Sequence, residues 1–150
     1  PQRYFEDAKL SGFSWVLFHY EAYEQTAKIN QAIDAAKEIN LKVGLVLNPE
    51  TPVGVIEKFA PNLNLIQLMG IHPGFQGREF IDSTTGRLIA LRRMAKNVII
   101  SVDGGVKPGI AGRCVKAGAS LIVAGSSILR SPDEKSVMEA LQSDIEANAI

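Results

Sequence analysis

Two strand-like segments, each followed by a glycine-rich turn, lie close together near the end of this chain and restrict how it can fold. The first, residues 98–102, is almost continuously apolar and β-branched and is followed by Asp-Gly-Gly. The second, residues 121–124, runs into Gly-Ser. A short helix is predicted between them at residues 110–116, with a proline ahead of it and a glycine after it. Parallel strands joined in this way bring both turns to one end of a sheet.

These turns predict a site for a phosphorylated small molecule. In (β/α)8 barrels the loops after the last two strands commonly hold a phosphate against backbone N–H groups. The corresponding positions here are Gly104 and Gly105 after one strand, and Gly125 and Ser126 after the next. Asp103 stands beside them, and the residues alone leave open whether its carboxylate takes part in catalysis or caps turn amides.

Strand and helix patterns alternate along the whole chain. Strands are predicted at residues 14–18, 42–47, 64–69, 98–102 and 121–124. Helices are predicted at residues 4–10, 25–39, 55–60, 85–95 and 110–116, and after a capping box at residues 131–134 up to about residue 147. Alternation without hairpin signals indicates a parallel sheet with crossover helices. A doubly wound sheet has the same alternation, but no G-x-G-x-x-G follows a strand.

We therefore predict an α/β fold, a partial TIM (β/α)8 barrel with five parallel strands. A complete barrel needs more than about 200 residues, so residues 1–150 are expected to form a single incomplete barrel domain. Sixteen basic residues balance sixteen acidic ones, which argues against a nucleic-acid partner. No apolar run approaches the ~18 residues of a membrane span. A lone cysteine, Cys114, fits a reducing compartment, so a cytoplasmic location is expected.

Several segments resemble, in the same order, the ribulose-phosphate 3-epimerase family. They are HYEA at 19–22, KVGLVLNPETP at 42–52, HPGFQG at 72–77, VDGGV at 102–106 and VAGSSI at 123–128. The resemblance implies a ribulose-phosphate-binding barrel of the pentose phosphate pathway that epimerises C3 of a ketopentose 5-phosphate, converting D-ribulose 5-phosphate to D-xylulose 5-phosphate. It also implies two aspartates that exchange protons on opposite faces of the substrate. The implied cofactor is a divalent metal, zinc first, with iron, manganese or cobalt as alternatives.

By the same resemblance, Asp103 is both a catalytic residue and a metal ligand. The residues that match the family's substrate and phosphate positions are Met69, Gly74, Phe75, Gln76, Gly77, Gly104, Gly105, Gly125 and Ser126. Met69 fills a gap in the core equally well. The family's other aspartate and its two metal-binding histidines have no counterpart in this sequence, and we do not interpret His19 or His72 as replacements. The chain thus resembles the family without its first three strands, and these residues alone are expected to be inactive.

Other interpretations stay open. One is an epimerase of a hexulose 6-phosphate, and another is a catalytically inactive half-barrel that keeps a phosphate site. Arg78 departs from the family pattern and adds a cation near that site. A synthase or decarboxylase with Asp-x-Lys-x-x-Asp is disfavoured, because the early match at Asp7 and Lys9 has Gly12 in the last position. The expected partner is a phosphorylated ketose, and the full-length protein is expected to be a homo-oligomer.

Overall fold

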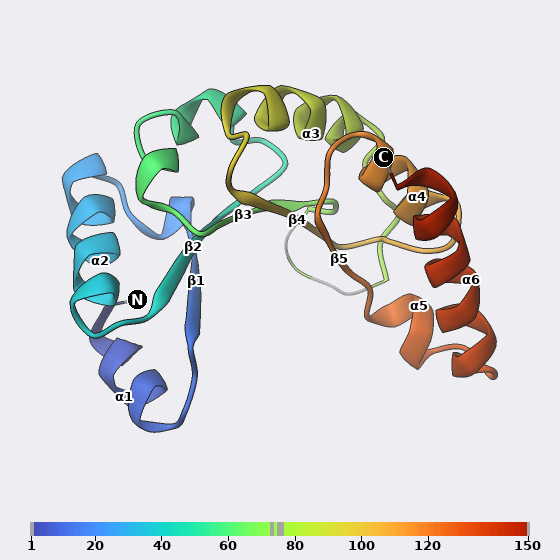
Figure 1. The fold of residues 1–150 in the computed structure, drawn as a ribbon, viewed down its shortest axis with the longest axis horizontal. Helices are drawn as coiled ribbons and strands as arrows, with labels where there is room; N and C mark the ends of the chain where they lie inside the picture. Colours follow the sequence, from blue (N-terminus) through green and yellow to red (C-terminus); the bar gives the residue numbers. More distant parts are fainter. Residues whose placement is uncertain (1, 73, 75–76, 150) are drawn as a thin grey trace.

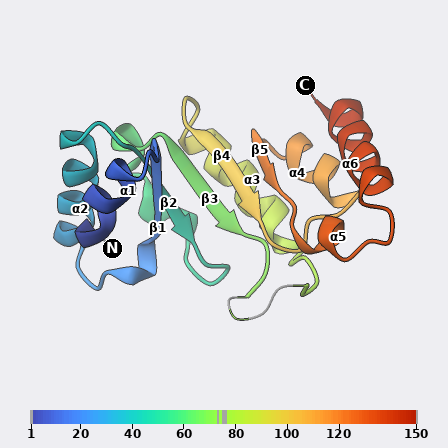
Figure 2. The same cartoon turned by 90° about the horizontal axis from the view of Figure 1, so that it is seen from below.

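The computed structural model describes residues 2–72, 74 and 77–149 and contains one sheet of five parallel strands (Figure 1). The strands are β1 Trp15–His19, β2 Lys42–Leu47, β3 Leu65–Met69, β4 Ile99–Asp103 and β5 Leu121–Val123. They neighbour one another in chain order, so β1 and β5 are the edges of the sheet within the described residues. The sheet is curved, and Figure 2 shows its open face, with α3 behind it. The predicted parallel sheet with helical crossovers is confirmed.

The described residues also form α-helices, of which α2, α3 and α4 connect strands along the convex side of the sheet (Figure 1). The α-helices are α1 Phe5–Leu10, α2 Thr26–Glu38, α3 Ser83–Met94, α4 Ile110–Lys116, α5 Ser126–Leu129 and α6 Glu134–Asn148. Short 3-10 turns occur at η1 Gln2–Tyr4, η2 Tyr20–Ala22, η3 Val53–Ile56 and η4 Ala60–Asn62. None of the helices in the described ranges combines the length and the hydropathy that a bilayer crossing requires.

Two of the predicted helical features are wrong in detail. The helix expected at residues 55–60 is a pair of 3-10 turns, because Gly54 and Pro61 flank a segment too short to sustain an α-helix. The last helix is capped by Asp133, whose side chain accepts a hydrogen bond of 3.0 Å from the Ser136 N–H. Ser131, at the start of the predicted capping box, instead donates to the Asp133 carbonyl.

The hydrophobic core lies between the sheet and the helices on its convex side. Alternate residues of a strand point to opposite faces, and on β2 the side chains of Val43, Leu45 and Leu47 are fully buried in this core. Helix α4 contributes Cys114, which is fully buried, and burial raises the pKa of its thiol to about 11. The single cysteine therefore packs as a small apolar residue.

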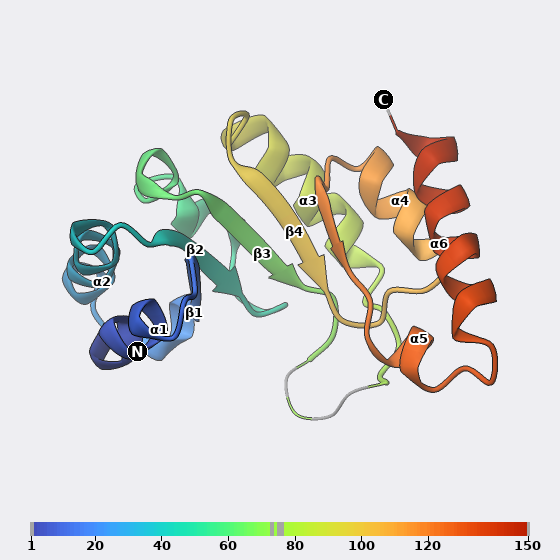
Figure 3. The same ribbon diagram turned by 60° about the horizontal axis from the view of Figure 1, so that its bottom comes forward.

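The alternate strand residues that do not enter this core point to the concave face. One row of register partners across it consists of Leu17, Gly44, Leu65 and Ile99. In a closed barrel such rows fill the interior, but here Leu17 and Ile99 keep 40% and 39% of their surface exposed. The next rows lead to the carboxyl ends of the strands, where the loops that follow β3, β4 and β5 lie on the same side of the sheet (Figure 3).

Candidate functional site

Asp103 is the last residue of β4, and its register partners on the neighbouring strands are Met69 and Val123. Its Oδ2 accepts a hydrogen bond of 3.3 Å from Nε2 of Gln67 on β3. Helix α4 begins seven residues later, with Gly109 at the cap position and no side-chain cap. Asp103 therefore does not cap α4, but it accepts a hydrogen bond from the Gly104 backbone, the turn-amide role that the sequence left open.

Partial burial raises the pKa of Asp103 above its ordinary value of 3.8. A hydrogen bond from the Gly104 backbone acts in the opposite direction and is the smaller effect. Burial therefore favours the protonated form of this carboxyl group relative to an exposed aspartate. A carboxyl group can act as a base or as an acid in a proton exchange.

The turn after β4 packs closely against the loop after β3. Gly104 and Gly105 have φ of +103° and +70°, a backbone region that glycine adopts without strain. A Cβ on Gly104 would lie 2.5 Å from Cγ1 of Ile71, and one on Gly105 would lie 2.7 Å from the backbone nitrogen of Phe80. Only glycines fit this contact, so it holds the turn beside Asp103 in one position.

A cavity of about 240 Å³ lies at the end of these strands. Its lining includes Asp103 and five of the predicted phosphate-site residues, namely Gly77, Gly104, Gly105, Gly125 and Ser126. Those five come from the loops after three different strands, and the fold brings them together around one carboxylate. Their binding and catalytic roles stay predictions.

Two other predicted site residues that the structure describes, Met69 and Gly74, do not line this cavity. Met69 adjoins Asp103 in register, and its sulfur lies 3.9 Å from Nε2 of Gln67. Gly74 lines neither this cavity nor the second cavity that adjoins it. Phe75 and Gln76 lie outside the described residues.

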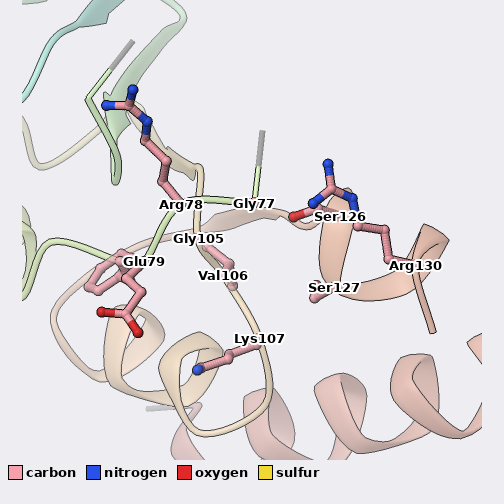
Figure 4. A pocket seen from close by; sticks show the side chains of 10 residues that line it. Gly77, Arg78, Glu79, Gly105, Val106, Lys107, Ser126, Ser127 and Arg130 are labelled. Atoms are coloured by element: carbon pink, nitrogen blue, oxygen red, sulfur yellow. The ribbon is translucent and has the colours of Figure 1, made fainter. Parts of the chain in front are cut away.

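A second cavity, of about 230 Å³, adjoins the first through shared lining residues, among them Gly77 and Ser126. Three cationic side chains line it, those of Arg78, Lys107 and Arg130, against one acidic side chain (Figure 4). In Figure 4 the Arg130 guanidinium lies beside Ser126 and toward Gly77, whereas Lys107 lies lower in the cavity. The excess positive charge favours an anion here.

Arg130 is placed to meet such an anion. A Cβ on Gly77 would collide with Nη1 of Arg130, so the guanidinium lies directly on that glycine. Within residues 2–72, 74 and 77–149 its guanidinium has no hydrogen-bond or ion-pair partner. An unpaired guanidinium at a cavity wall can bind a phosphate with two parallel hydrogen bonds.

Sequence reasoning did not identify Gln67, Ser101 or Arg130. Gln67 and Ser101 each stand two residues before a predicted site residue, on the strand face that Asp103 shares. A polar residue at this spacing in an apolar strand is a signal that the period of two could have revealed. No such signal pointed to Arg130. This residue follows directly after α5, and that short helix, which places Arg130 beside Gly77, was not predicted.

The described residues do not fit a metal site by themselves. No group of three or more His, Cys, Asp or Glu side chains among them is arranged to hold a metal ion. His19 lies 3.5 Å from Glu21, and His72 pairs with Glu50, so each histidine contacts a different carboxylate. A zinc site needs about three protein ligands, and Asp103 supplies one carboxylate.

Sequence comparison finds named relatives. A profile of the Ribulose-phosphate 3 epimerase family matches residues 1–129. A ribulose-phosphate 3-epimerase of Bacillus subtilis (strain 168) is 37% identical over 147 residues, which are 95% of this chain and 66% of the relative. One of Escherichia coli (strain K12) is 36% identical over 143 residues, covering 93% of this chain and 62% of the relative. The chain thus spans somewhat less than two thirds of these relatives' length.

Solved structures share the fold. A 3-hexulose-6-phosphate synthase from Salmonella typhimurium superposes with a TM-score of 0.74 at 16% identity, covering 98% of this chain and 68% of that one. An orotidine 5'-phosphate decarboxylase from Pyrococcus horikoshii OT3 has a TM-score of 0.69 at 18% identity, covering 97% and 67%. Both are TIM barrels, so the predicted partial barrel is confirmed; at these identities the likeness concerns the fold alone.

Proposed function

The chain belongs to the ribulose-phosphate 3-epimerase family, and on that premise we propose that the protein interconverts D-ribulose 5-phosphate and D-xylulose 5-phosphate by inverting C3. The observation that carries the proposal is the cavity in which the Asp103 carboxylate faces the glycine turns after β3, β4 and β5. A neighbouring cavity with excess positive charge adjoins it. A small sugar phosphate could therefore place its phosphate in the cationic part and its carbon chain near the carboxylate.

The proposed reaction is a proton exchange at the carbon next to a carbonyl. A base on one face of the substrate takes the C3 proton, and the electron pair of the C–H bond moves into an enediolate. An acid on the other face then returns a proton to C3, which inverts the carbon without a net change in protons. Asp103 is proposed as one of these two groups, because it lines the cavity and a carboxyl group can accept or donate a proton. The other group is proposed to lie outside the described residues.

The phosphate is proposed to bind between the glycine turns and Arg130. A phosphate ester carries about −1.5 to −2 charges near neutral pH, which matches the cations that line this cavity. Gly77 and Ser126 line both cavities. They therefore stand where the phosphate end of a substrate would meet its carbon chain.

Asp103 is also proposed as one ligand of a divalent cation, whose remaining ligands would have to come from outside the described residues. Such a cation, when bound, supplies charge stabilisation to a developing oxyanion. The alternative is a phosphate-binding protein without turnover; it is favoured because Asp103 supplies the one carboxylate among the described residues that line the first cavity.

A coupled epimerase assay of the full-length gene product, with added divalent cations, distinguishes these functions. Asp103→Asn is expected to lower kcat by about 100-fold or more, because a positioned acid or base contributes about that factor. The matched control is Asp34→Asn on the exposed surface of α2, which is expected to leave kcat unchanged. Equal rates for Asp103→Asn and the parent would remove Asp103 from the mechanism. Phosphate-ester binding without turnover in the parent would favour the alternative.

A further inference from the structure

Two polar side chains adjoin Asp103 on the concave face of the sheet. Gln67 on β3 and Ser101 on β4 are register partners, one row below Met69 and Asp103. Nε2 of Gln67 donates to Oδ2 of Asp103 over 3.3 Å, and Oγ of Ser101 donates to Oε1 of Gln67, also over 3.3 Å. The three side chains therefore form a chain of hydrogen bonds from Ser101 through Gln67 to Asp103.

The hydroxyl of Ser101 selects the orientation of the Gln67 carboxamide. A carboxamide has an acceptor end and a donor end, and Ser101 satisfies the acceptor, Oε1. The donor end then faces Asp103. With the amide reversed, Oε1 would face a carboxylate oxygen, and two acceptors repel each other. Ser101 is fully buried, so its hydroxyl would lack a partner without Gln67.

Placing the polar side chains of Gln67 and Ser101 on this face of the sheet costs folding free energy. The row below them on the same face contains Leu65 and Ile99, and burying a polar group among such residues is unfavourable unless its hydrogen bonds are made. The NH₂ group of Gln67 has two contacts, the Asp103 carboxylate and, at 3.9 Å, the sulfur of Met69. The arrangement thus satisfies both ends of the amide and directs it at the carboxylate.

We propose that Gln67 is a positioning residue of the epimerase reaction and that Ser101 orients it. Gln67 holds Oδ2 of Asp103, so the carboxylate keeps one rotation about its Cβ–Cγ bond and Oδ1 remains for proton exchange with the substrate. Neither Gln67 nor Ser101 lines the cavity that Asp103 lines. Their effect therefore falls on kcat and leaves KM unchanged. The inference rests on the proposed role of Asp103.

Variants of the full-length protein test the proposal by steady-state kinetics. Gln67→Met keeps the length of the side chain and removes the amide, and it is expected to lower kcat about 10-fold with KM unchanged, as for other residues that orient a functional group. Ser101→Ala is expected to lower kcat roughly 3-fold, because one hydrogen bond is lost. Ser101→Thr keeps the hydroxyl and is expected to have the kcat of the parent. Ile99→Val, on the same face one row below, is the control that leaves kcat unchanged.

The double variant Gln67→Met/Ser101→Ala separates positioning from a general loss of packing. Because Ser101 acts through Gln67, the double variant is expected to have the same kcat as Gln67→Met. If the two residues acted independently, the fold-decreases in kcat of the two single variants would multiply. Parental kcat in Gln67→Met, or a multiplied effect in the double variant, would overturn the proposal.

Crystal structures of the parent and Gln67→Met give a readout that does not depend on turnover. A rotated Asp103 carboxylate is expected in the variant, and an unmoved one would contradict the positioning role. If the parent itself has no epimerase activity, the proposed function fails, and these structures still decide whether Gln67 positions the carboxylate.

Discussion

The backbone N–H of Gly70 donates a hydrogen bond of 2.6 Å to the carbonyl of Asp103. This bond continues the pairing of β3 and β4 by one residue and joins the loop after β3 to the residue that carries the proposed chemistry. Gly70 in turn accepts a hydrogen bond of 2.8 Å from the Ile81 N–H, so the returning end of that loop is attached to the same point.

Gly70 has no room for a side chain. A Cβ there would collide with the Gly104 carbonyl and would lie 2.9 Å from the Phe80 ring. Gly70→Ala is therefore expected to lower the free energy of unfolding by about 2 kcal/mol, a usual cost of overpacking. The control is Gly54→Ala, where a Cβ would meet nothing within 4 Å and the change should stay within about 0.5 kcal/mol. Denaturant unfolding measures both, and equal stabilities would contradict the close packing of Gly70.

The raised pKa of Asp103 predicts a pH-dependent stability. The folded protein holds this proton more tightly than the unfolded chain, so stability falls as the pH rises from the ordinary value of 3.8 through the raised folded-state pKa. In the Asp103→Asn variant the side-chain amide does not titrate, so stability does not fall in this way as the pH rises. The variant is expected to have the higher unfolding temperature at pH 7, and the difference should shrink as the pH is lowered toward 4. Thermal unfolding with a chelator present measures this, and a difference independent of pH would exclude the linkage.

Arg130 is expected to bind the phosphate group of the substrate. Arg130→Gln should raise KM for the phosphorylated ketose about 10-fold and change kcat by less than about 2-fold, because a charge-assisted hydrogen bond to the non-reacting end contributes uniform binding. Arg93→Gln, on the exposed surface of α3, is the matched control with both constants unchanged. An unchanged KM in Arg130→Gln would place the phosphate elsewhere.

A polypeptide of residues 1–150 alone is expected to self-associate. The β5 edge of the sheet exposes backbone pairing groups, and Leu121 on it keeps 44% of its surface exposed. Leu121→Lys is expected to reduce the association seen by sedimentation velocity, because a charged side chain on an edge strand opposes pairing. Leu129→Lys removes an even more exposed leucine, away from the sheet, and should have less effect. A monodisperse monomer before any substitution would contradict this prediction.

The pattern of elements could be read from the chain with small errors. The strand predicted at residues 42–47 agrees with β2 Lys42–Leu47, and the helix at residues 110–116 agrees with α4 Ile110–Lys116. Each of these segments has a local signal: the strand is a nearly continuous apolar run, and the helix has a proline before its start and a glycine after its end. The segment at residues 55–60 has conflicting local signals, because its apolar run is short and Gly54 and Pro61 flank it, and 3-10 turns form there instead of an α-helix.

The sequence by itself determined the order of strands and helices, the placement of Asp103 at a strand end and the glycine turns beside it, because these depend on residues close together in the chain. Only the tertiary structure decided which side chains meet. Gln67 and Asp103 are 36 residues apart, and Ser101 and Gln67 are 34 apart. The period of two places Gln67 and Ser101 on the strand face that Asp103 shares. The packing of the whole sheet against its helices then sets which residues of β3 and β4 stand opposite each other, and this register brings them into contact.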